Sequence, residues 1–210
     1  PESLPPEKRQ IKPISESFNW IKQFTGLFSQ INIQKLLLAM FLLNLAFAGL
    51  QSNFPLYSNF RFQWNPTQNG YFYLYVGVCA VFIQGFLFGK LQPRFGEKRL
   101  TIFGLTLMAI GLAFMAFAPQ AWILFPAVTI VALGTGTSIP SLTALVSLRV
   151  SESEQGRLMG GTQTLLALTN IFGPIIAGIS FELINFSSPY WIGSLFAIFA
   201  LMIAYIGLRK

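Results

Sequence analysis

Amide and hydroxyl side chains placed inside long apolar runs are the residues of this chain that could do chemistry. A polar group at membrane depth needs a partner or a watery cavity. Amides and hydroxyls at neutral pH suit binding a solute better than moving a proton. The candidates for a binding cavity, with two aromatic side chains beside them, are Asn44, Gln51, Asn53, Phe54, Tyr57, Thr137 and Ser141.

Each of these polar groups also has a simpler reading. A Ser or Thr hydroxyl in a helix often bonds the backbone of its own helix. An Asn or Gln can hydrogen-bond a neighbouring helix instead of lining a cavity. The sequence leaves these alternatives open for the amide residues Asn44, Gln51, Gln84, Gln163 and Asn170.

Few residues in this sequence could support catalysis. The chain has no His, a single Cys (Cys79), no paired carboxylates in an apolar setting and no Gly-rich phosphate loop after a strand. General acid–base chemistry and Cys/His zinc sites need such groups. We therefore expect no enzyme activity, no metal and no cofactor.

The composition is that of a membrane protein. Hydrophobic residues make up 53% of the 210 residues and charged residues only 10%, against about 25% charged in soluble domains. A membrane-spanning helix needs roughly 20 mostly apolar residues. Runs of suitable length predict an all-α membrane protein with six transmembrane helices at about 36–60, 70–89, 100–117, 122–148, 158–181 and 190–208.

The basic residues predict the orientation. If six helices alternate, thirteen of the fourteen Lys and Arg residues fall on one side, and the other side receives only Arg61. Basic residues concentrate in cytoplasmic loops, so both ends of the segment should be cytoplasmic. Residues 1–35 are expected to form a cytoplasmic linker with an interfacial amphipathic helix, and residues 36–210 the six-helix bundle. Scattered basic clusters do not favour a nucleic-acid partner.

The loop that begins Gly89-Lys90-Leu91-Gln92-Pro93 and ends Arg94-Phe95-Gly96-Glu97-Lys98-Arg99-Leu100 resembles the signature of the major facilitator superfamily between helices 2 and 3, which recurs more weakly between helices 8 and 9. Pro93 stands where the signature has an acid. The resemblance implies that the gating-loop residues are Gly89, Arg94, Gly96, Lys98 and Arg99. The opening Pro1–Pro5 and the runs around Gly134–Pro140 and Gly173-Pro174 resemble the drug:proton antiporter branch, which includes tetracycline and multidrug exporters.

The resemblance implies that this chain is the linker plus helices 7–12, one half of a major facilitator fold with two inverted three-helix repeats. It implies alternating-access, proton-coupled efflux of drug-like or amphiphilic compounds across a plasma membrane, the bacterial inner membrane. The partners would be the lipid bilayer, a small-molecule substrate, the proton, and the missing N-terminal half of the same polypeptide, which would hold the coupling acids. Candidates for the contact between the halves are Gln84, Gly85, Gln163, Asn170, Gly173 and Pro174.

Two other functions stay open at this point. The chain could be a non-transporting membrane binding or assembly subunit, or a self-assembling six-helix half-transporter. Either would use the same apolar helices.

Overall fold

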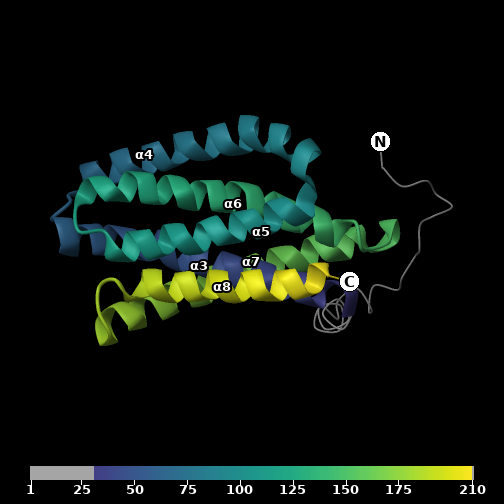
Figure 1. Ribbon diagram of the computed structural model, residues 1–210. Coiled ribbons are helices and arrows are strands. Elements are labelled where there is room, and N and C mark those ends of the chain that lie inside the picture. The colour runs from purple at the N-terminus through teal and green to yellow at the C-terminus, as the bar shows by residue number, and fades with distance from the viewer. Residues whose placement is uncertain (1–30, 210) are drawn as a thin grey trace, which may run out of the picture.

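The computed structural model describes residues 31–209, and every regular element in that range is helical (Figure 1). The first long helix begins at Ile31, so it starts before the predicted boundary at residue 36. The amphipathic helix expected in the linker falls on residues 1–30, outside the described range. The long helices are α3 (Ile31–Phe62), α4 (Pro66–Phe82), α5 (Phe88–Phe117), α6 (Leu124–Ser147), α7 (Gln155–Leu183) and α8 (Ser188–Leu208).

Short helical turns join some of these helices. A π-helical turn, η2 (Ile83–Leu87), links α4 to α5, and the turns η3 (Ala121–Ile123) and η4 (Glu152–Glu154) precede α6 and α7. Backbone groups exposed to lipid are costly, so apolar segments that cross a bilayer fold as helices. Five segments of the described range are helical, long and apolar enough to do so. The prediction of an all-α, multi-pass membrane protein is confirmed.

One of these five segments cannot be a single straight helix across a membrane. Pro66–Phe117 has 52 residues, about 78 Å at 1.5 Å per residue, against a hydrocarbon core of about 30 Å. Gly96 interrupts it with φ 70° and ψ 163°, and the ribbon turns back between α4 and the body of α5 (Figure 1). A positive φ is easy for glycine because it has no Cβ.

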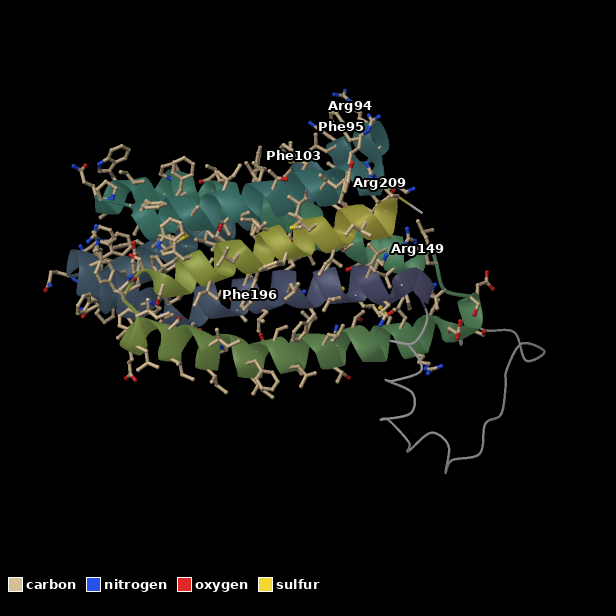
Figure 2. All side chains as sticks on the ribbon, turned by 60° about the horizontal axis from the view of Figure 1, so that its bottom comes forward. Arg94, Phe95, Phe103, Arg149, Phe196 and Arg209 are labelled. Carbon is tan, nitrogen blue, oxygen red and sulfur yellow. The ribbon has the colours of Figure 1, made fainter. Side chains whose placement is uncertain are left out.

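The bundle has two ends that differ in charge. We call one end the Gly96 end, after the glycine in the α4–α5 turn; it also holds the α6–α7 connection and the end of α8 (Figure 1). We call the other the Trp64 end, after Trp64 in the α3–α4 connection; it also holds the α5–α6 and α7–α8 connections. Arg94, Arg149 and Arg209 lie together at the Gly96 end (Figure 2). Among the described residues, the Trp64 end has one basic residue, Arg61, whose guanidinium lies 5.0 Å from the centre of the Phe186 ring.

α3 is the central helix of the bundle. It packs against α6, α7 and α8, while α5 packs against α6 and α8. α4 lies at one edge and contacts chiefly α6 (Figure 1). Side chains of α3 such as Leu37, Leu43 and Tyr57 are completely buried, so this helix anchors the rest.

Glycines set the closest helix crossing, between α5 and α6. A Cβ on Gly134 would lie 2.6 Å from the Met108 nitrogen and 2.7 Å from the Gly104 oxygen. A Cβ on Gly104 would lie 2.6 Å from the Gly134 oxygen. In lipid, helices associate through close packing of small residues because no hydrophobic force drives them together. The two glycines therefore fix how α5 and α6 meet.

We expect Gly134→Ala to lower the free energy of unfolding by about 1–3 kcal/mol, as overpacking does, because the new methyl meets backbone that cannot move aside. Thermal unfolding of the purified protein in detergent measures this. Gly70→Ala is the control, since nothing lies within 4 Å of its added Cβ. Equal melting temperatures for the two variants would contradict the role of this crossing.

Candidate functional site

A pocket of about 100 Å³ lies between α3, α4 and α6. Most of its surface is apolar, and its lining includes no Asp, Glu, Lys or Arg side chain. Ligand pockets are typically apolar with a few placed polar groups, and this one has that character. Its lining residues are Phe47, Leu50, Gln51, Phe54, Phe72, Tyr73, Val76, Ala80, Gln84, Met115, Val128, Val131, Ala132 and Thr135.

Aromatic rings from two helices form one wall of the pocket. Phe54 of α3 and Phe72 of α4 are stacked, with ring centres 4.2 Å apart and planes 11° apart. Tyr73 meets Phe54 edge-on at 5.7 Å, and its hydroxyl donates to the Gln51 carbonyl oxygen at 3.1 Å. Phe54 and Phe72 are almost completely buried by this packing, whereas Tyr73 is 40% exposed and is the ring that a solute could contact.

Two side-chain amides are the polar groups that the pocket offers for hydrogen bonding. Gln51 on α3 and Gln84 on the π-helical turn η2 are both exposed residues of the lining. The Thr135 hydroxyl instead bonds its own helix, donating to the Val131 oxygen at 3.1 Å. Each Gln amide offers two N–H donors and a carbonyl acceptor, so the pocket can orient a neutral polar group without placing a charge in it.

The π-helical turn places Gln84. The Phe88 N–H bonds the Ile83 oxygen, five residues back, which widens the helix by one residue. Ile83 is buried against Gly136, where a Cβ would lie 2.6 Å from Ile83 Cγ2 and 3.5 Å from Gln84 Cγ. π-turns are frequent at functional sites. Gly136 is therefore the residue on α6 that leaves room for the wide turn beside the pocket.

Of the predicted cavity residues, the structure brings only Gln51 and Phe54 into this pocket. Asn44 is buried, and its amide donates to the Met40 oxygen of its own helix at 2.7 Å. The Thr137 hydroxyl likewise donates to the Leu133 oxygen at 2.7 Å. For Thr137 this is the own-helix bond that was the simpler reading for a hydroxyl. Asn44 also bonds its own helix, whereas the alternative considered for it was a bond to a neighbouring helix.

The remaining three predicted residues also lie outside the pocket. Tyr57 is completely buried, donates to the Met115 oxygen at 2.8 Å and packs on Tyr190 with ring centres 4.5 Å apart. Asn53 and Ser141 are buried, and the Asn53 Nδ2 and Ser141 Oγ atoms have no hydrogen-bond partner among the described residues. A count of polar residues on a span does not say which face of the helix carries them, so the sequence could not tell which of these positions line this pocket.

Sequence reasoning weighed Gln84, on the turn η2, as a cavity residue but missed the lining residues of α4. Phe72, Val76, Ala80 and Gln84 recur at four-residue spacing and form one stripe facing the pocket. Residues four apart share a helix face. Together with the run of aromatic residues at the start of α4, that spacing was the signal available in the sequence.

The interface candidates divide into two groups. Gln84, Gly85, Gln163, Asn170 and Pro174 are exposed in this chain. Gly173 is not exposed. It is buried against α3 within this bundle, where a Cβ would lie 2.7 Å from the Ala48 Cβ and 3.1 Å from the Gly49 nitrogen. A small residue marks a close crossing but does not reveal which helix crosses there.

Large exposed apolar side chains occur on α4, α5, α7 and α8, and those of α4 and α7 lie beside exposed small residues. On α4 the exposed large side chains are Tyr71, Tyr73, Leu74, Val78, Val81 and Phe82. On α7 they are Met159, Ile171, Phe172, Ile175, Ile179 and Leu183. Small residues lie among them, with nothing within 4 Å of an added Cβ, namely Gly77, Gly156, Gly160 and Gly178.

The loop that carries the signature forms the turn at the Gly96 end. Gly89, Arg94, Lys98 and Arg99 are exposed there. The Gln92 side chain donates to Glu97 Oε1 at 2.9 Å. This hydrogen bond, helped by one from the backbone, lowers the pKa of the Glu97 carboxyl below its ordinary value, so the turn keeps one negative charge among its basic residues.

Comparison with known proteins assigns the family. The family model of the Major Facilitator Superfamily matches residues 80–210. The chain is 31% identical to the tetracycline resistance protein, class C, of Escherichia coli over 83% of its own length, and 32% identical to multidrug resistance protein 2 of Bacillus subtilis over 94%. It covers 42% and 48% of those two proteins. The chain belongs to the major facilitator superfamily, whose members are transporters and not enzymes.

Solved structures agree on the fold. The human organic anion transporter MFSD10 (TETRAN) matches with a TM-score of 0.84 at 21% identity, over 97% of this chain and 52% of that one. The transporter PepTSo matches with a TM-score of 0.70 at 16% identity, over 85% of this chain and 37% of that one. The chain therefore spans about half the length, or less, of the proteins it resembles.

Because Tyr57 does not line the pocket, we expect Tyr57→Phe to act on stability. Loss of its hydrogen bond to Met115 should lower the free energy of unfolding by about 0.5–1.5 kcal/mol, as measured by thermal unfolding in detergent. Tyr71→Phe is the control, since Tyr71 is 67% exposed. A Tyr57→Phe variant as stable as the control would show that this bond contributes nothing.

Proposed function

We propose that the intact protein exports a flat, amphiphilic, drug-like solute across the bacterial inner membrane, and that the pocket between α3, α4 and α6 binds it. The observation that carries the proposal is the pocket itself, which combines stacked rings with two amides inside a major facilitator fold. Relatives named for tetracycline and multidrug resistance support export as the direction.

The proposed topology has six crossings in two inverted three-helix repeats, with the Gly96 end in the cytoplasm. The turn at Gly96 divides the 52-residue segment into two crossings. The concentration of basic residues at that end, with Arg61 at the other, fits the positive-inside rule. The first repeat would comprise α3, α4 and α5, and the second α6, α7 and α8.

The exposed faces of α4 and α7 are proposed to contact an N-terminal six-helix half of the same polypeptide. Exposed glycines on both helices would allow close approach of neighbouring backbones. The relatives are about twice as long as this chain, which supports a second half of similar size.

Transport would then follow alternating access, in which two halves rock about a site near the midplane. A bound solute would pack against the Tyr73 ring and the apolar lining and hydrogen-bond Gln51 and Gln84. A proton gradient is the proposed energy source. Because the pocket lining carries no acid, the proton-binding groups would belong to the other half.

We expect Gln51→Ala and Gln84→Ala each to raise the apparent KM for tetracycline efflux by about 2–10-fold, the value of one hydrogen bond. Proton-driven tetracycline uptake into inverted membrane vesicles measures this with the full-length protein. Thr106→Ala should leave the KM unchanged, because the Thr106 hydroxyl bonds the Ile102 oxygen of its own helix at 2.8 Å outside the pocket.

A KM that is unchanged in both glutamine variants would rule out this pocket as the binding site. Full-length protein that folds but transports no drug under a proton gradient would instead contradict the proposed export function.

A further inference from the structure

Trp64 occupies an unusual place for so large a side chain. It lies in the three-residue connection between α3 and α4, yet it is only 8% exposed. Two other connections at the same end carry exposed or half-buried residues, such as Trp122, which is 64% exposed. The indole of Trp64 is therefore turned inward, into the bundle.

Hydrogen bonds fix this connection in place. The Asn59 amide donates to the Trp64 oxygen at 3.0 Å, and the Trp64 N–H bonds the Ser58 oxygen at 3.3 Å. Asn65 and Gln68 bond each other's backbone N–H groups at 2.9 Å and cap α4. Gln63 has a φ of 58°, a left-handed conformation that costs a non-glycine residue about 1 kcal/mol. The fold holds a strained backbone here, and the effect is to aim Trp64 inward.

The indole contacts the aromatic wall of the pocket. Its ring centre lies 6.1 Å from that of Phe54 and 5.7 Å from that of Phe72, the stacked pair of the lining. It also lies 6.3 Å from the ring of Phe125, at the start of α6. All three helices that form the pocket thus meet at one indole.

The pocket extends from the Trp64 end of the bundle toward the Gly96 end. Phe54 and Phe72 lie nearest to Trp64, and Phe47 and Gln84 lie seven and twelve residues further along their helices. At 1.5 Å per residue, the lining extends over roughly 10–18 Å. Trp64 stands beyond its aromatic end, where the connection would face the outside.

We infer that Trp64 closes the outer end of the pocket and keeps external water and solutes out of it while the solute is loaded from the cytoplasmic side. This rests on the proposed function and its orientation. The indole and the rings of Phe54, Phe72 and Phe125 come from the α3–α4 connection, α3, α4 and α6, so this closure is built from residues of this half.

Thiol labelling of the full-length protein in intact cells tests this closure. All native cysteines, Cys79 included, are replaced by serine, and Val76→Cys is introduced one helical turn beyond Phe72 in the lining. A membrane-impermeant maleimide is added from outside. We expect Trp64→Ala to speed labelling of this cysteine by roughly threefold or more, because loss of the indole raises the population of states open to the outside.

Two variants separate closure from general damage. Trp64→Phe keeps an aromatic ring and should label nearly as slowly as Trp64 itself. Trp122→Ala removes an exposed tryptophan at the same end and should leave the rate unchanged. If Trp64→Ala does not accumulate, Trp64→Leu leaves a smaller apolar side chain and should label at an intermediate rate.

A second reporter distinguishes failure of this inference from failure of the orientation. Glu182→Cys places a thiol on an exposed residue at the same end of the bundle. If this thiol reacts from outside while Val76→Cys labels at the same rate with and without Trp64, the closure is overturned and the orientation stands. If it does not react from outside, the proposed orientation falls and the closure falls with it.

Discussion

The structure depends on one constraint, which is that helices surrounded by lipid gain no hydrophobic free energy from touching one another. They must be held by close packing. The crossing of Gly104 and Gly134 meets this requirement between α5 and α6, and Gly173 against Ala48 meets it between α7 and α3. Around these fixed contacts the central helix α3 keeps its large side chains buried.

The pocket exists because α4 does not take part in this close packing to the same extent. It contacts chiefly α6 and leaves a hollow along α3, which rings and amides line. The wide π-helical turn at Ile83–Leu87 packs on Gly136 and connects the pocket segment of the chain to the turn at Gly96. α4 is the least tightly packed of the helices beside the pocket. Large apolar side chains and small residues remain exposed on α4 and α7.

Polar side chains in the bundle serve two different purposes. Asn44, Thr137 and Thr135 satisfy their hydrogen-bonding groups within their own helices, which makes them compatible with burial in a membrane protein. Gln51 and Gln84 remain available in the pocket. Residue type alone could not separate the two groups, since both consist of uncharged polar residues in apolar runs.

The sequence by itself determined that this chain is a helical membrane protein and a major facilitator, because apolar length and a turn motif are local properties. It also indicated a binding site made of amides and aromatic rings. Which residues line the pocket was decided only by the tertiary structure. The rotation of each helix placed Gln51 and Phe54 in the pocket and Tyr57 against Met115, and contacts between distant helices set that rotation. The inward position of Trp64 is of the same kind, since it depends on rings from α3, α4 and α6 that are brought together only when the bundle closes.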